Sequence, residues 1–162
     1  MSLSLRLDSF QHPRRIIETA LSLCPVLRKM WYNLAGSLNM NEFALVIEDD
    51  QDQAFVFAEA LRAAGFEPEI VRDGKAALAR LETTNPSLVV LDLHVPRVLG
   101  KDLLYYIRTD ERLAGTRVIL ATGDYRLSES IQVEADVVLL KPVGFDQLRD
   151  LASRMRLTDI PD

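Results

Sequence analysis

The stretch Ser87–Pro96 reads SLVVLDLHVP, a short apolar run that ends in a single acidic residue. The run Leu88–Leu91 suits a strand that is buried on both faces, as in parallel sheets. Asp92 comes directly after it, and an aspartate is almost never fully buried without a partner. In open parallel α/β sheets, ligand chemistry gathers at the carboxyl ends of the strands. Asp92 is therefore the first candidate for a functional residue.

Short apolar strands and amphipathic helices alternate on both sides of this stretch. The pattern predicts strands at 43–47, 67–71, 88–91, 117–121 and 136–140. It predicts helices at 51–64, from 74 onward, at 101–109, at roughly 127–133 and at about 145–155. Five strand–helix units with short loops indicate an α/β fold, in which a parallel sheet lies between helices and the crossovers are right-handed.

The 162 residues divide into three parts. Residues 41–157 form the regular domain, and 158–162 form a short tail. Residues 1–40 are an N-terminal extension whose apolar spacing over 14–34 fits one or two helices. The alternative is a misassigned start, because Met40 leads directly into the first strand.

Composition narrows the functional classes. The net charge of -5 argues against a nucleic-acid-binding protein. No apolar run approaches the roughly 20 residues that span a bilayer. The single cysteine, Cys24, allows no internal disulfide and fits a reducing compartment. We therefore expect a cytoplasmic protein with no membrane span.

Polar residues follow four of the predicted strands, on what would be one edge of the sheet. They are Glu48, Asp49, Asp92, Thr122 and Lys141. Neighbouring carboxylates repel one another unless a cation lies between them. Mg²⁺ suits a few oxygen ligands, because it keeps several waters and often binds phosphate as well. A nucleophilic carboxylate, a metal, a hydroxyl and a lysine are the parts needed to move a phosphoryl group onto Asp92.

The same residues carry a family resemblance. Glu48–Asp49, Asp92 with Pro96 and Gly100, Ala121–Asp124 and Lys141–Pro142 resemble the motif set of the receiver domain of two-component response regulators. The resemblance covers about residues 42–156. It implies a flavodoxin-like (βα)5 doubly wound sheet with strand order 2-1-3-4-5.

The resemblance also implies a role for each matched residue. Asp92 matches the phosphoacceptor, and Thr122 and Lys141 match the hydroxyl and the lysine that contact the phosphoryl group. Glu48, Asp49, Asp92 and the backbone carbonyl of His94 match the Mg²⁺ ligands, with Asp49 favoured over Glu48 as a direct ligand. The Lys141–Pro142 bond resembles one that is cis in this family.

The function implied is that of a stand-alone receiver without its own output domain. It would accept a phosphoryl group from a histidine kinase or phosphotransfer protein and signal by protein contact. It would promote its own phosphorylation and dephosphorylation, and would not be an enzyme in the usual sense.

Two features of the sequence depart from the family. Val138 stands where an aromatic residue is frequent, and the segment between Thr122 and Lys141 is short. Both departures are compatible with an alternative function, that of a non-phosphorylated interaction module with the same fold.

A phosphatase of the haloacid dehalogenase type would need a second aspartate at the position of His94. The acidic run at 48–50 could also be a solvated turn, with Asp50 or Asp52 as a helix N-cap.

Overall fold

The computed structural model describes residues 42–123 and 135–157. These residues belong to one compact unit, Asn41–Asp159. The extension over residues 1–40, the helix predicted at 127–133, Asp124 and the tail lie outside the described residues. Among the helices that are described, none is long and apolar enough to cross a membrane.

The predicted sheet is present and fully parallel. Its strands are β1 (Glu42–Ile47), β2 (Phe66–Val71), β3 (Leu88–Leu91), β4 (Arg117–Thr122) and β5 (Val137–Leu140). Their spatial order is β2-β1-β3-β4-β5, as predicted. The order places β3, which leads to Asp92, in the centre of the sheet. β2 is an edge strand, and its Pro68 is tolerated there because an edge strand has a side without ladder hydrogen bonds.

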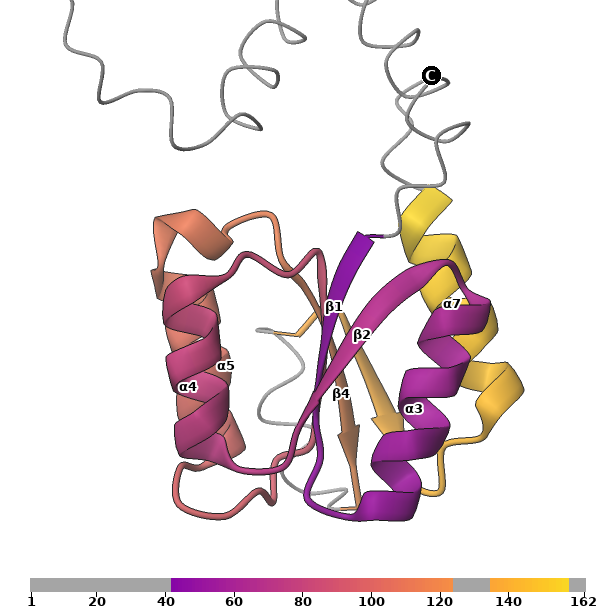
Figure 1. The fold of residues 1–162 in the computed structure, drawn as a ribbon, viewed down its shortest axis with the longest axis horizontal. Helices are drawn as coiled ribbons and strands as arrows, with labels where there is room; N and C mark the ends of the chain where they lie inside the picture. Colours follow the sequence, from indigo (N-terminus) through magenta and orange to yellow (C-terminus); the bar gives the residue numbers. More distant parts are fainter. Residues whose placement is uncertain (1–41, 124–134, 158–162) are drawn as a thin grey trace, which may run out of the picture. The chain divides into compact units, whose positions relative to one another are not determined.

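Helices cover both faces of the sheet (Figure 1). They are α3 (Gln51–Ala63), α4 (Gly74–Thr83), α5 (Gly100–Thr109) and α7 (Phe145–Leu157), with a 3-10 turn at Glu111–Leu113. Figure 1 shows α3 and α7 on one face, and α4 and α5 on the other. The central strands β3 and β4 therefore have an apolar layer on either side, which explains their continuous hydrophobic runs. The edge strand β2 is more polar and carries Glu67 and Glu69.

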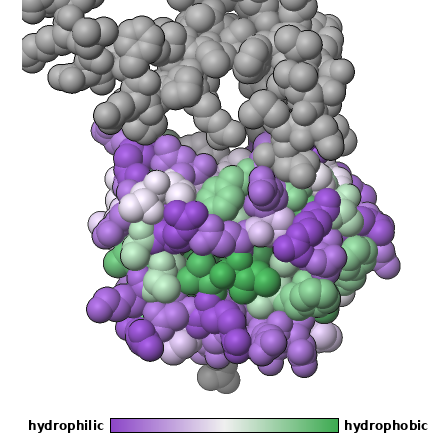
Figure 2. All heavy atoms as spheres, in the orientation of Figure 1, coloured by the Kyte–Doolittle hydropathy of each residue, from purple (hydrophilic) through white to green (hydrophobic). Residues whose placement is uncertain are grey.

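Alternate residues of each central strand enter two separate cores. On β1, Ala44 and Val46 pack with α3 and α7, whereas Leu45 and Ile47 pack with α4 and α5. Strands β3 and β4 divide their side chains in the same way. The period of two in a strand produces this division. Figure 2 shows apolar side chains in the middle of the face that contains the β2 edge, where Ile70 is 37% exposed.

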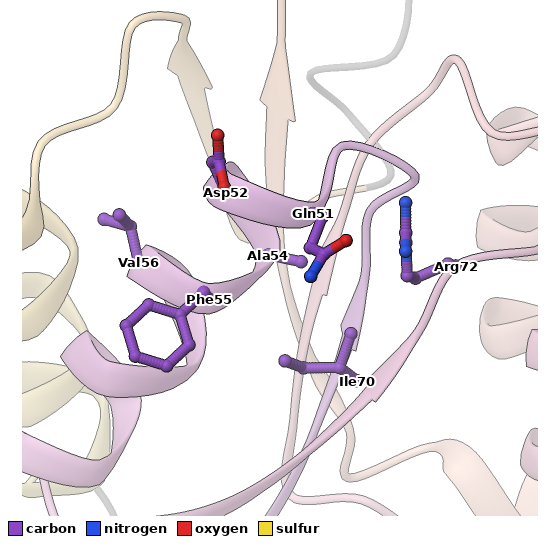
Figure 3. A pocket seen from close by; sticks show the side chains of 7 residues that line it. All are labelled: Gln51, Asp52, Ala54, Phe55, Val56, Ile70 and Arg72. Atoms are coloured by element: carbon purple, nitrogen blue, oxygen red, sulfur yellow. The ribbon is translucent and has the colours of Figure 1, made fainter.

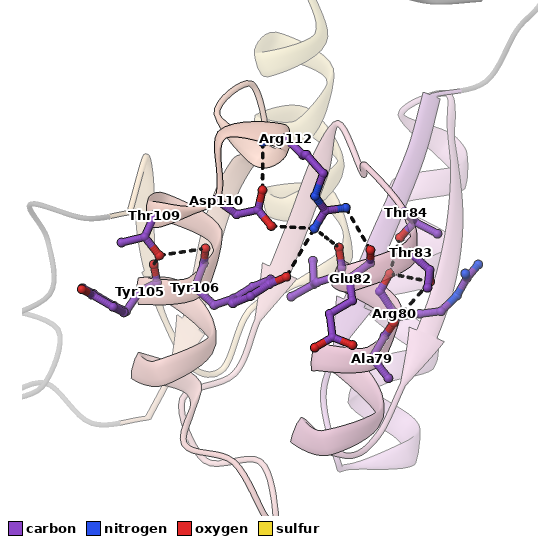
Figure 4. A network of polar contacts seen from close by, with 11 residues as sticks. Ala79, Arg80, Glu82, Thr83, Thr84, Tyr105, Tyr106, Thr109, Asp110 and Arg112 are labelled. Carbon is purple, nitrogen blue, oxygen red and sulfur yellow. Dashed lines mark hydrogen bonds and ion pairs between the residues drawn. The ribbon is translucent and has the colours of Figure 1, made fainter. Parts of the chain in front are cut away.

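A polar network closes the end of the α4–α5 layer that is remote from the strand carboxyl ends (Figure 4). The guanidinium of Arg112 donates to the carbonyls of Glu82 at 2.9 Å and Leu81 at 3.3 Å. It also donates to the Tyr106 hydroxyl and pairs with Asp110. These bonds satisfy the last carbonyls of α4, which a helix cannot bond internally. The network joins α4 to α5 and to the 3-10 turn.

The predicted boundaries differ from the structure by one or two residues, within the usual uncertainty of helix and strand ends. Strand β5 begins at Val137, not at Asp136. Asp136 instead forms two contacts with Val118 on β4: its amide donates to the Val118 carbonyl at 3.0 Å, and its carboxylate accepts from the Val118 amide at 2.7 Å. The 3-10 turn was not predicted, because three residues carry no helical periodicity.

Candidate phosphoacceptor and metal site

The carboxyl ends of four strands bring the predicted site residues to one edge of the sheet. Ile47 on β1 and Leu91 on β3 are direct partners in register. Glu48 and Asp92 therefore leave the sheet side by side, and the Asp92 amide donates to the Ile47 carbonyl at 2.9 Å. On the other side of Asp92, the Lys141 amide donates to the Thr122 carbonyl at 2.9 Å.

The side chain of Lys141 joins two of these carboxylates. Its ammonium nitrogen lies 2.6 Å from Asp92 Oδ2, 2.7 Å from Glu48 Oε2 and 2.9 Å from Glu48 Oε1. Glu48 is 1% exposed and Asp92 is 5% exposed. The single ammonium group of Lys141 therefore contacts two almost fully buried carboxylates. The bond between Lys141 and Pro142 is cis, as the resemblance implies.

Burial and neighbouring charges have opposing effects on the pKa values of Glu48 and Lys141. Burial raises the pKa of the Glu48 carboxyl above 4.5, and the nearby Asp92 charge adds to this, while the hydrogen bond from Lys141 opposes it. For Lys141, burial by itself would lower the pKa. Its hydrogen bonds to Asp92 and Glu48 outweigh that effect, so the pKa of Lys141 lies above 10.5. The Lys141 ammonium therefore stays charged, whereas the contact with Lys141 does not fully offset the effect of burial on Glu48.

Asp49 completes a group of three carboxylates. One oxygen each from Glu48, Asp49 and Asp92 can be chosen such that all lie within 4.8 Å of one another. Asp49 is exposed, in contrast to the two buried members of the group. Three carboxylates and one ammonium leave an excess of two negative charges, which a divalent cation would balance. An oxygen-only donor set with an open side fits Mg²⁺, which retains several of its waters.

His94 contacts the Asp92 carboxylate, and Thr122 lies at the end of the neighbouring strand β4. The backbone amide of His94 donates to Asp92 Oδ1 at 3.0 Å, so the loop after β3 folds around the carboxylate. The His94 ring is more than half exposed, and its Nδ1 lies 3.9 Å from the same oxygen. Thr122 is fully buried at the end of β4. The metal-binding role of the His94 carbonyl stays a prediction.

Gly100 allows helix α5 to begin directly behind Asp92. A Cβ at this position would lie 2.5 Å from Leu93 Cα and 2.6 Å from the Asp92 carbonyl oxygen. Both are backbone atoms, which cannot move aside as a flexible side chain would. The residue before it, Leu99, is the helix N-cap without a side-chain hydrogen bond. The close approach of Gly100 therefore fixes the backbone that carries Asp92.

The loop between Asp92 and Gly100 is also tied to helix α4. The carbonyl of Pro96 accepts from the Gly74 amide at 3.0 Å. Arg97 has a φ of 72° and pairs with Asp73 through Nε at 2.9 Å. Asp73 is in turn the N-cap of α4. These contacts connect the loop after Asp92 to a neighbouring helix end.

The acidic run at 48–50 divides between two roles. Asp50 is the N-cap of α3, since its Oδ1 accepts from the Gln53 amide at 2.8 Å. The solvated-turn interpretation is therefore correct for Asp50. Glu48 and Asp49 instead face Asp92. Arg72 was not predicted as a site residue, and its guanidinium donates to the Asp49 carbonyl. Its place directly after β2, next to β1 in the sheet, was the available signal.

Several known proteins are similar to this chain in sequence. The chain is 33% identical over 116 residues to a probable methanogenesis regulatory protein, FilR2, of Methanothrix harundinacea, covering 65% of this chain and 75% of the relative. It is 30% identical over 112 residues to the sensory transduction protein RegX3 of Mycobacterium tuberculosis, covering 69% of this chain. The chain spans about half the length of that relative, 48%.

A solved structure shares the fold. It is the receiver domain of the sensor histidine kinase PA1611 from Pseudomonas aeruginosa, with a magnesium ion coordinated in its active site cleft. The TM-score is 0.64 at 22% identity, and the match covers 71% of this chain and 97% of that one. The family model of the response regulator receiver domain matches residues 44–153. With the predicted sheet order also present, the chain belongs to the receiver domain family of two-component response regulators.

Proposed function

We propose that this receiver domain accepts a phosphoryl group on Asp92 from a phosphohistidine of a sensor kinase or histidine phosphotransfer protein. The observation that carries the proposal is the contact of the Lys141 ammonium with both Asp92 and Glu48, with the Asp49 carboxylate beside them. This arrangement places a nucleophilic oxygen, a cation and an acidic metal site within one small volume. A structural ion pair alone would not need the third carboxylate.

The transfer exchanges one bond to phosphorus for another. An Asp92 carboxylate oxygen forms the new bond to phosphorus, the bond from phosphorus to the donor imidazole nitrogen breaks, and that nitrogen then takes a proton. Lys141 contacts Asp92 Oδ2 and would follow the charge onto a phosphoryl oxygen. The Thr122 hydroxyl would donate to a second oxygen, and the His94 amide would continue to hold the carboxyl group of Asp92. Water that attacks the same phosphorus would break its bond to the Asp92 oxygen, which returns the free aspartate and releases inorganic phosphate.

The metal belongs to the proposal as well. Glu48, Asp49, Asp92 and the His94 carbonyl would hold Mg²⁺, with Asp49 as the exposed, directly bound carboxylate. Bound there, the ion neutralises charge that accumulates on the transferring phosphoryl group. Lys141 bonds both oxygens of Glu48 and so would hold this carboxylate in place beside the ion. The downstream step we propose is contact with another protein.

A non-phosphorylated interaction module is the second candidate, and Val138 is the observation that favours it. Val138 pairs with Leu120 in the sheet and is partly buried against the α4–α5 core. An aliphatic side chain at this place offers no ring that could swing between exposed and buried positions. The phosphoacceptor chemistry does not depend on Val138, so direct labelling separates the two candidates.

The experiment uses a small acyl phosphate donor with Mg²⁺. The wild-type chain should acquire a phosphate that survives acid and is lost in base, and Asp92→Asn should acquire none. Asp50→Asn is the matched control, since asparagine is an equally good N-cap and labelling should persist. Equal labelling of wild type and Asp92→Asn would rule out the assignment. No labelling of the wild type, together with no Mg²⁺ binding, would favour the interaction module.

A further inference from the structure

Arg72 leaves the sheet next to the acidic turn that follows β1. Ile47 and Val71 are the last paired residues of β1 and β2. The Glu48 amide donates to the Val71 carbonyl at 3.2 Å, which extends the pairing by one step. Arg72 directly follows β2, so it lies beside Glu48 and Asp49, which directly follow β1.

The guanidinium of Arg72 holds a single backbone oxygen with two donors. Nε lies 3.0 Å and Nη2 lies 2.8 Å from the carbonyl oxygen of Asp49. Two donors in a rigid planar fork fix the direction of the carbonyl as well as its position. Because the peptide unit is planar, a fixed carbonyl also restrains the torsion that joins it to Asp49 Cα. That Cα carries the carboxylate.

The residues on either side of Asp49 are anchored by other contacts. Glu48 is held by Lys141 at 2.7 Å. Asp50 caps helix α3, and its carbonyl accepts from the Ala54 amide at 2.9 Å. Asp49 itself has an exposed side chain, so the direction of its carboxylate depends on the backbone. Arg72 supplies the restraint at the middle residue of the turn.

We propose that Arg72 is a positioning residue for the metal site, which directs the Asp49 carboxylate toward Glu48 and Asp92. This inference rests on the proposed function, because it takes Mg²⁺ as the ion that Asp49 binds. Two effects of Arg72 on that ion have opposite signs. Its positive charge repels a cation, whereas its hold on the turn assembles the ligands. The direction of change in a variant therefore separates the two effects.

Arg72 lies at an open surface, so its truncation should leave the core intact. It lines a groove of about 450 Å³ between α3 and β2, together with Gln51, Phe55 and Ile70. Figure 3 shows Arg72 at one side of this groove, with Ile70 below it on β2 and Phe55 across from it on α3. A shortened side chain at this position enlarges the groove and creates no enclosed cavity.

The test is a calorimetric titration of the full chain with Mg²⁺. Arg72→Ala should bind Mg²⁺ about 3- to 10-fold more weakly than wild type, the loss expected for one to two hydrogen bonds. Arg72→Lys keeps the charge without the fork and should lie between the two. Arg62→Ala removes an exposed arginine of α3 that pairs with Glu59, and its affinity should match wild type. If Arg72→Ala does not fold, the Mg²⁺ affinity of Arg72→Lys relative to wild type tests the proposal by itself.

The outcomes separate this inference from the proposed function. Mg²⁺ binding by Arg72→Ala that equals or exceeds that of wild type, at an unchanged melting temperature, would overturn the positioning role. In that case Mg²⁺ binding by wild type and its loss in Asp49→Asn would leave the proposed function standing. A wild-type chain that binds no Mg²⁺ would overturn both.

Discussion

The ammonium nitrogen of Lys141 lies 2.6 Å from Asp92 Oδ2, although 49 positions separate the two residues in the sequence. Strands β3 and β5 are not neighbours, and β4 lies between them. The contact therefore depends on the length of the lysine side chain reaching across the end of β4. It ties the candidate phosphoacceptor to the last strand of the sheet.

Removal of the lysine charge should destabilise the fold in a pH-dependent way. Lys141→Met leaves Glu48 and Asp92 buried without their cation, a change that costs up to about 3 kcal/mol of unfolding free energy. The pKa of Lys141 is raised above 10.5 in the folded state. Its contribution is therefore complete below pH 10.5 and is lost as the pH rises through the raised value.

Urea unfolding of wild type and Lys141→Met across the alkaline range checks this prediction. The difference in unfolding free energy should be constant between neutral pH and pH 10, and should shrink at higher pH. Arg149→Met serves as the control, since Arg149 forms ion pairs with Asp146 and Asp150, which are both exposed. A difference that grows with pH would contradict the proposed environment of Lys141.

Asp49 should control stabilisation by Mg²⁺. A ligand that binds only the folded state raises the unfolding free energy by about 2.7 kcal/mol at a concentration of 100 times its Kd. Asp49→Asn should lose this gain, and without Mg²⁺ it should be at least as stable as wild type, because it removes repulsion among three carboxylates. Thermal unfolding with and without Mg²⁺ measures both effects. An Mg²⁺-dependent shift of normal size in Asp49→Asn would place the ion elsewhere.

Gly100→Ala should damage the fold at the loop after Asp92. The added Cβ would lie 2.5 Å from Leu93 Cα, so the backbone after β3 or the start of α5 must move. Overpacking of this kind costs about 1–3 kcal/mol. Gly115→Ala is the matched control, since a Cβ there meets, apart from its chain neighbours, no atom of the described residues within 4 Å. Chemical denaturation should show a loss for the first variant alone; equal stability of both would refute the close approach.

Asp73→Ala should weaken the connection between α4 and the loop after Asp92. Asp73 Oδ1 accepts from the Lys75 and Ala76 amides at 2.9 and 3.0 Å, and its other oxygen pairs with Arg97. Loss of such a cap costs about 1–2 kcal/mol. Asp146→Ala, which removes an exposed aspartate from the first turn of α7, should cost less. Amide exchange should become faster at the start of α4 in Asp73→Ala, and unchanged exchange there would contradict the cap.

The sequence predicts the sheet and the edge that carries the site because each central strand is an apolar run followed by a polar residue. Leu88–Leu91 before Asp92 is the clearest example, and the order of the strands follows from the family resemblance. Residues that are distant in sequence then meet at the strand ends, as Glu48, Asp92 and Lys141 do.

Contacts that depend on exact distances could not be predicted in this way. Val71-Arg72-Asp73 reads as an ordinary polar turn, and only the register of β1 with β2 shows that Arg72 meets the Asp49 carbonyl. Gly100 reads as a helix start, and the 2.5 Å approach to Leu93 is visible only in three dimensions. Similarly, to predict that Lys141 contacts two carboxylates, one must know how far its side chain reaches.

The most direct test of the central claim is to identify the residue that carries the phosphoryl group. Borohydride reduces an aspartyl phosphate to homoserine, and mass spectrometry of the reduced chain after reaction with a small phosphodonor locates the change. We predict homoserine at position 92 in wild type, and none when Mg²⁺ is omitted or when the Asp92→Asn variant is used. Reduction at Asp49 or Asp50, with Asp92 unchanged, would contradict it.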